Sequence, residues 1–78
     1  MFTYYDENAV ENAFAIKEIA TYKVMPKSGE MIDGHFVMDH ISVQLINNAY
    51  FEIPYDDYYD DFKSMIIKYY GLVNTVAV

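Results

Sequence analysis

Hydrophobic and polar residues alternate through the middle of the chain, and this pattern predicts a β-hairpin. The first strand spans residues 35–46, and a period of two separates its apolar side from its polar side. The apolar side carries Ile41, Val43 and Leu45. Asn47–Asn48 follows, and asparagine tolerates the positive φ of a tight turn. Residues 49–53 return as the partner strand, which Pro54 ends.

The pattern changes to a helical period after Pro54, and residues 55–70 are predicted to form an amphipathic helix. Asp56 or Asp57 can cap its start, and Gly71 stands where a C-terminal cap belongs. The apolar side of this helix carries Tyr58, Tyr59, Phe62, Met65, Ile66 and Tyr69. Residues 72–78 are predicted as a last strand.

The N-terminal third predicts a short strand and then a helix. Residues 2–5 are aromatic and typical of a strand. Asn8 and Glu11 have the spacing of a capping box, which favours a helix that either ends near Ile16 or continues with the Lys17 side chain reaching to water. On such a helix four apolar residues would share one face: Val10, Ala13, Phe14 and Ile16.

The next segment predicts a strand followed by a loop. Residues 19–25 contain alternating apolar positions, whereas proline, serine and two glycines in residues 26–34 favour a loop. The resulting order is β-α-β-β-β-α-β. It predicts an α+β fold, in which two helices pack on one antiparallel sheet of four to five strands. At 78 residues, the chain is expected to form a single domain over residues 1–78.

Composition adds information about partners. The chain is 54% hydrophobic and 18% aromatic, which is enough for a core and argues against disorder. Twelve acidic residues stand against five lysines, with no arginine, and the net charge is -7. Such a charge repels phosphate backbones, so we expect no direct binding of nucleic acid and a basic protein surface as the partner.

Location and cofactors follow from what the sequence lacks. The chain contains no cysteine, which fits a reducing cytoplasm, and no apolar run approaches the ~20 residues of a membrane span. His35 and His40 would point to opposite faces of a straight strand, so a metal site is not expected. The serines lack a nucleophile motif, and we predict neither a cofactor nor an enzyme.

The stretch IPYDDYYDDF gathers four carboxylates on one side of the predicted helix. With Asp56 at zero and about 100° per residue, Asp57, Asp60 and Asp61 fall near 100°, 40° and 140°. The apolar side lies opposite, from about 180° to 300°. The sequence therefore separates an acidic side of the helix from the side that faces the core.

Two interpretations of this acidic side remain open. Acidic residues at a helix start interact favourably with the macrodipole, and net charge keeps an aromatic-rich domain soluble. Alternatively, carboxylates one turn apart, about 5.4 Å, can resemble the phosphates of one nucleic-acid strand. Partner binding would then involve six residues: Glu52, Tyr55, Asp56, Asp57, Asp60 and Asp61. Asp39 would join them if it faces the same side.

In size, charge and this aspartate–tyrosine stretch, the chain resembles the small acidic inhibitors that bacteriophages make, such as anti-CRISPR and DNA-mimic anti-restriction proteins. The resemblance implies a non-enzymatic inhibitor in the host-cell cytoplasm. Its partner would be the nucleic-acid-binding groove of a host defence complex, such as a CRISPR effector or a restriction enzyme. The alternative is a protein–protein adaptor, subunit or antitoxin whose acidic face mainly gives solubility.

Overall fold

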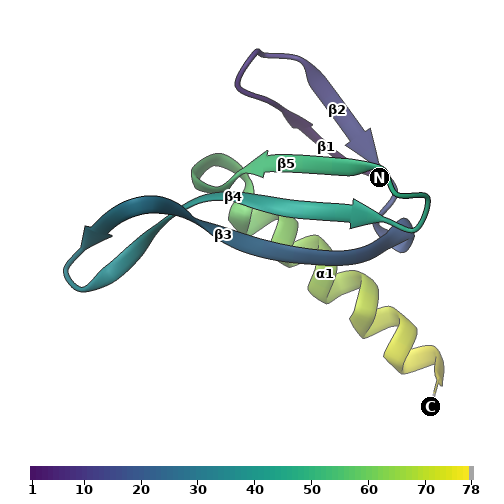
Figure 1. Ribbon diagram of the computed structural model, residues 1–78. Coiled ribbons are helices and arrows are strands. Elements are labelled where there is room, and N and C mark those ends of the chain that lie inside the picture. The colour runs from purple at the N-terminus through teal and green to yellow at the C-terminus, as the bar shows by residue number, and fades with distance from the viewer. Residues whose placement is uncertain (78) are drawn as a thin grey trace.

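The chain folds into five strands, one 3-10 turn and one long helix (Figure 1). A computed structural model describes the backbone of residues 1–77 and the side chains of residues 1–71. In chain order the elements are β1 (Phe2–Tyr5), β2 (Glu11–Phe14), η1 (Ile16–Glu18), β3 (Ile19–Ile32), β4 (His35–Leu45), β5 (Tyr50–Pro54) and α1 (Tyr55–Ala77).

The strands form two antiparallel sheets. One contains β1 and β2, and the other has the order β3-β4-β5. The predicted hairpin over residues 35–53 is confirmed, with Ile41 opposite Ile53. Its turn uses the expected asparagines: Asn48 has a φ of 70°, and Asn47 Oδ1 accepts a hydrogen bond from the Ala49 N–H at 2.9 Å.

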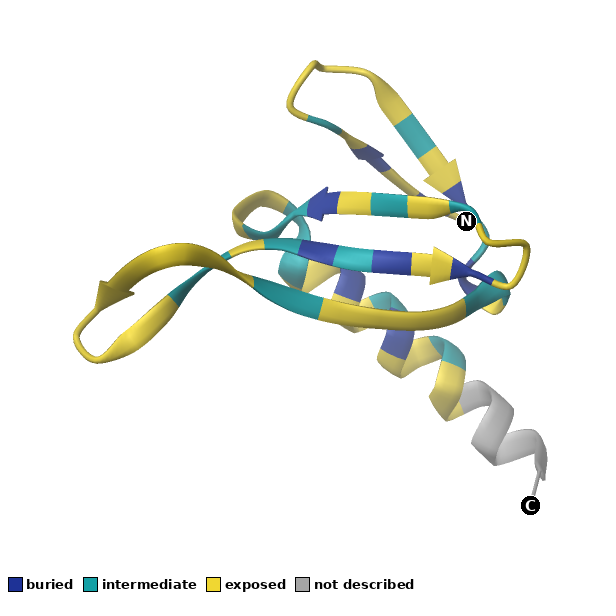
Figure 2. Cartoon of the chain, in the orientation of Figure 1, coloured by how far each residue is buried: buried dark blue, intermediate teal, exposed yellow. Residues whose placement is uncertain are grey.

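The helix α1 covers one face of the three-stranded sheet, and the core lies between them (Figure 2). Ile41, Val43 and Ile53 are fully buried on this face. On the helix side Phe62 and Ile66 are buried, as the apolar pattern predicts, whereas Met65 and Tyr69 are half-buried. The helix assignment from residue 55 onward is therefore confirmed.

Aromatic contacts join the small sheet to the rest of the molecule. The Phe2 ring meets the Phe62 ring edge to face, with centroids 5.5 Å apart, and lies 5.7 Å from the Phe14 ring. Phe14 in turn stacks on Phe51 at 5.0 Å. Rings from four elements thus share one aromatic cluster, which fixes the β1–β2 hairpin against β5 and α1.

The predicted N-terminal helix is wrong, because residues 6–10 form a hairpin turn instead. Asp6 Oδ1 accepts hydrogen bonds from the backbone N–H groups of Asn8 and Val10, at 2.9 and 3.0 Å. Ala9 adopts a left-handed φ of 59°, which no helix permits. An isolated helix of two turns is only marginally stable. The hairpin is more stable, because it gains the pairing of β2 with β1 and the hydrogen bonds to Asp6 in the turn.

The predicted loop over residues 26–34 is also wrong, because β3 runs through it to Ile32. Asp33 and Gly34 have φ values of 51° and 80°, the pair of positive angles that a tight hairpin turn requires. Pro26 is tolerated because β3 is an edge strand, and Gly29, at a φ of 77°, lies in an irregular part of the pairing. The hairpin therefore extends well beyond the core.

The chain does not form the predicted last strand either. Residues 72–77 continue α1 past Gly71, which has no positive φ and is not a cap, while Val78 lies outside the described residues. The expected arrangement of two helices on one sheet of four to five strands is therefore wrong. The described residues form sheets of two and three strands and a single α-helix.

Candidate functional site

The first two turns of α1 carry the acidic cluster. The chain passes directly from Pro54, the last residue of β5, into the helix, and Asp56 and Asp57 occupy the first turn. All four aspartates of the cluster are exposed. Together with two tyrosines they line one shallow hollow, whose members are Tyr55, Asp56, Asp57, Tyr59, Asp60 and Asp61. We call this surface the acidic face.

The two tyrosines of the acidic face form a pair. The rings of Tyr55 and Tyr59 have centroids 4.6 Å apart and planes inclined by 31°. Lys63, one turn further on, places its Nζ atom 5.8 Å from the Tyr59 ring centroid, within the range of a cation–π contact. The pattern placed Tyr59 on the apolar side of the helix, and its half-buried side chain does pack against the core. It also lines the hollow beside the carboxylates.

Within residues 1–71, no ion pair neutralises the carboxylates of the acidic face. Among residues 1–71 the ion pairs join Lys27 to Glu30, and His40 to Asp39 and Glu52, so none of them involves the acidic face. Four like charges on two helical turns repel one another, and a basic surface would relieve that repulsion. The acidic face therefore carries four charges that no ion pair among residues 1–71 compensates.

Tyr58, between the two aspartate pairs, has a structural role. Its Oη atom accepts a hydrogen bond from the Tyr5 backbone N–H at 2.9 Å, and its ring meets Phe2 and Tyr4 edge to face. This bond satisfies an amide at the end of β1. It also ties the small sheet to the start of α1.

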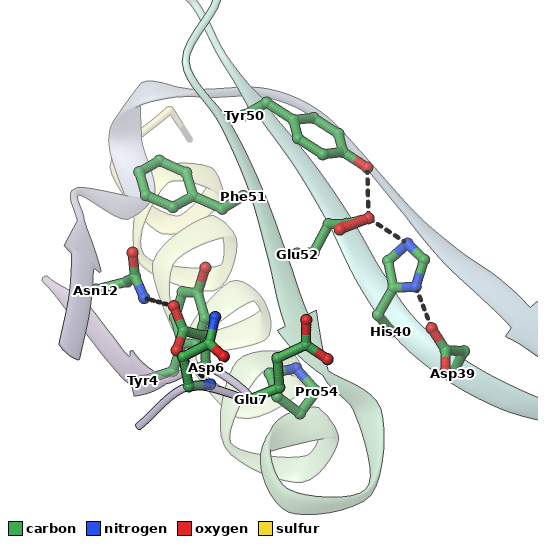
Figure 3. A pocket seen from close by; sticks show the side chains of 11 residues that line it. Tyr4, Asp6, Glu7, Asn12, Asp39, His40, Tyr50, Phe51, Glu52 and Pro54 are labelled. Carbon is green, nitrogen blue, oxygen red and sulfur yellow. Dashed lines mark hydrogen bonds and ion pairs between the residues drawn. The ribbon is translucent and has the colours of Figure 1, made fainter. Parts of the chain in front are cut away.

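Glu52 lies on a different surface from the aspartates. It lines a groove of about 450 Å³ between the β1–β2 turn and the outer face of the three-stranded sheet (Figure 3). The groove is lined by Tyr4, Asp6, Glu7, Asn8, Asn12, Asp39, His40, Tyr50, Phe51, Glu52 and Pro54. Asp39, which was to join the aspartates if it faced their side, lines this groove as well. The structure therefore divides the six predicted binding residues between two surfaces.

His40 connects the two carboxylates of the groove. Its Nδ1 atom lies 2.6 Å from Asp39 Oδ2, and its Nε2 atom lies 3.4 Å from Glu52 Oε1. Both contacts are hydrogen bonds only when both ring nitrogens carry protons, that is, in the charged form of histidine. Sequence analysis considered His40 only as a metal ligand. Its neighbour Asp39 was the available signal for this pairing.

The hydroxyl groups beside His40 are occupied within the same network. Ser42 Oγ donates to Tyr50 Oη at 3.0 Å, and Tyr50 Oη donates to Glu52 Oε1 at 3.5 Å. A serine nucleophile needs a base that accepts its proton, and the Ser42 hydroxyl donates to a tyrosine instead. Within the described residues, no cluster of three or more histidine and acidic side chains is arranged to hold a metal ion.

Asp6 and Tyr4 form the opposite wall of the groove. The hydrogen bond from the Val10 N–H is the main cause that lowers the pKa of Asp6, and the Asn12 amide, which donates to Oδ2 at 3.2 Å, adds to it. Burial raises the pKa of Tyr4, and the negative charge of Asp6 raises it further. Asp6 and Glu7 belong to a segment that sequence analysis placed before a helix, so their contribution to this groove was missed.

Comparisons with known proteins give no further assignment. No protein-family model matches the chain, and neither the curated proteins nor the solved structures contain a significant match. Within residues 1–77, α1 is too polar to cross a membrane, and no other helix has the length to do so.

Proposed function

We propose that this protein is a non-enzymatic inhibitor that acts in the cytoplasm. It binds a nucleic-acid-handling protein, such as a CRISPR effector or a restriction enzyme, through the acidic face. The observation that supports this most is the set of four exposed aspartates on two turns of α1, with no ion pair among residues 1–71. The protein itself does not bind nucleic acid, because its net charge is -7.

The geometry of the acidic face suits a groove built for a phosphate backbone. Successive aspartate pairs are separated by one turn, about 5.4 Å along the helix, and a nucleic-acid strand carries one charge per ~3.4 Å. Lysine and arginine side chains can adjust to that difference. The Tyr55–Tyr59 pair provides flat aromatic surface beside the charges, where a nucleic acid would present bases.

Removing the four charges tests the proposal. Replacing Asp56, Asp57, Asp60 and Asp61 by asparagine preserves shape and changes the net charge by four. An exposed ion pair contributes about 0.2–1 kcal/mol, so binding should weaken by roughly 1–4 kcal/mol. The measurement is inhibition of DNA cleavage by a panel of purified CRISPR effectors and restriction enzymes. Wild-type inhibition should weaken as salt rises, because salt screens exposed charges.

A matched control separates the acidic face from total charge. Replacing Glu7, Glu11, Asp39 and Glu52 by their amides removes four charges, three of them from the groove, and leaves α1 unchanged. This control variant should inhibit like the wild type, with circular dichroism confirming that both variants fold. If the folded α1 variant inhibits as strongly as the wild type, the acidic face is not the binding site. If only the control variant loses inhibition, the binding site is the groove.

The adaptor or antitoxin alternative makes a different prediction for the same experiment. If the acidic face serves only solubility, the α1 variant should precipitate more readily but keep every interaction of the wild type. A wild-type protein that inhibits no enzyme of the panel, and captures no nucleic-acid-handling protein from host lysate, would refute the inhibitor proposal.

A further inference from the structure

The outer part of the β3–β4 hairpin projects from the body as a two-stranded ribbon (Figure 1). We call residues 26–38 the arm. Residues 26–36 are all exposed, and Figure 2 shows this end of the hairpin almost entirely in yellow. Three large apolar side chains are among them, with exposed fractions of 56% for Met31, 65% for Ile32 and 58% for Phe36. A solvated hairpin end would ordinarily carry polar residues at such positions.

The strand register places four apolar residues on one face of the arm. Pro26 lies opposite Met38, and Met31 lies opposite Phe36. Directly opposed residues share a face, and so do residues two apart on a strand, which joins Phe36 to Met38. Methionine side chains adapt to irregular apolar surfaces and are common where proteins bind. We call Pro26, Met31, Phe36 and Met38 the apolar face of the arm.

The surface area of the chain is large for its mass. It exposes 5788 Å², whereas a compact monomer of this mass, 9.1 kDa, exposes about 4,900 Å². The radius of gyration is 13.9 Å, against about 11.5 Å for a compact chain of this length. The chain is therefore more extended than a compact monomer, and the projecting arm contributes to this extension (Figure 1).

We propose that a second copy of this chain covers the arm, with the two apolar faces packed against each other about a two-fold axis. The remaining charges of this hairpin favour this occupant. Lys27 and Glu30 pair with each other within one arm, at 3.2 Å, which leaves Lys23 near the base of the arm and Asp33 in the turn at its tip. Two arms that run in opposite directions place Lys23 of one copy near Asp33 of the other. A two-fold arrangement makes both contacts at once.

The arms pack by their faces, not by pairing the free edges of β3. The register of β3 with β4 shifts between Met25 and Pro26 and again between Pro26 and Met31. Such bulges, a proline and edge lysines are the features that prevent strand-to-strand pairing at a sheet edge. A two-stranded ribbon is marginally stable alone in water, and packing against a second ribbon stabilises both.

Sedimentation at micromolar concentrations tests the proposal. The wild type should sediment as a dimer, at twice 9.1 kDa, and the double variant Met31→Glu/Phe36→Glu should sediment as a monomer. Ile46→Glu is the matched control, because Ile46 is 70% exposed in the distant β4–β5 turn and should leave the dimer intact. Both variants alter exposed side chains, and circular dichroism verifies their fold. A monomeric wild type would assign the arm to another partner and overturn the proposal.

Cross-linking gives a second measurement that does not disturb the apolar face. The chain has no cysteine, so a single cysteine reports only its own position. Ser28 lies on β3 between Pro26 and Met31, close to the inferred axis, whereas Ser64 is exposed on α1. Ser28→Cys should be cross-linked into a dimer by a short bismaleimide, and Ser64→Cys should not. Equal cross-linking of both variants would overturn the arm-to-arm arrangement.

Discussion

The substitution Phe62→Ala removes the side chain that links α1 to both sheets. Phe62 is 2% exposed, and its ring meets Phe2 of β1 and Tyr22 of β3 edge to face, at 5.5 and 5.3 Å. Truncation of a buried phenylalanine usually costs 3–5 kcal/mol, of which each aromatic pair accounts for about 0.5–1.5 kcal/mol. Since Phe62 loses two such pairs, we expect a loss in the upper half of that range, about 4–5 kcal/mol.

A loss of this size is comparable with the whole stability of the domain. At about 0.05–0.15 kcal/mol per residue, 78 residues give a free energy of unfolding of roughly 4–12 kcal/mol. Urea denaturation of Phe62→Ala, followed by circular dichroism, should therefore show an unfolding midpoint at a much lower urea concentration than the wild type, or no folded baseline at all. Ile67→Ala on the same helix is the control. Ile67 is 60% exposed, and the change should stay within about 0.5 kcal/mol. If Phe62→Ala costs no more than Ile67→Ala, the packing of α1 described above is incorrect.

Two further predictions concern the turn at Asp6 and the helix at Gly71. The pKa of Asp6 is lowered by its hydrogen bond from Val10, so Asp6 stabilises the fold above its unfolded pKa of about 3.9. That contribution is lost as pH falls through the lower folded value. Asp6→Asn should therefore narrow the difference in unfolding free energy between pH 7 and pH 2, and an unchanged difference would contradict this role. Gly71→Ala should stabilise the protein by about 0.5–1 kcal/mol, because α1 continues through Gly71 and its Cβ would meet nothing within 4 Å. Destabilisation in a thermal melt would indicate instead that Gly71 ends the helix.

The parts of the fold that the sequence predicted are those in which local pattern and tertiary packing agree. The β4–β5 hairpin has alternating apolar residues and an Asn-Asn turn. The helix α1 has an apolar stripe, of which Phe62 and Ile66 are buried in the core. The sequence did not predict the arm, because the proline and glycines of residues 26–34 favour a loop. The Asp33–Gly34 pair in the same segment favours a hairpin turn, and this is the conformation that the chain adopts.

The N-terminal segment was mispredicted for a different reason. Phe14 and Ile16 are buried, as a helical stripe requires, but Val10 is 54% exposed. Four residues of β2 and three of η1 are too few for a period of two to be distinguished from a period of 3.6. The contact that decides the outcome is the pairing of β2 with β1, which no local pattern specifies.

Helical geometry alone predicts the part of the candidate site that lies on α1. The exposure of the four aspartates follows from their position on the wheel, and Tyr55 joins them. Glu52 was assigned to the same surface because it is near in sequence, yet its contact with His40 places it in the groove. That separation depends on how the strand β5 leads into the helix, and only the three-dimensional arrangement specifies it.

The position of α1 after all the strands has a consequence for synthesis on the ribosome. The inner face of the large sheet, with Ile41, Val43 and Ile53, is covered by Phe62 and Ile66, which emerge later. Because a nascent chain appears from its N-terminal end, the strands leave the ribosome before the helix that covers them. Phe2 also emerges before Phe62, whose ring completes its packing. The nascent chain therefore passes through an aggregation-prone interval that ends only when the helix has emerged, and chaperones that bind apolar strands would act in that interval.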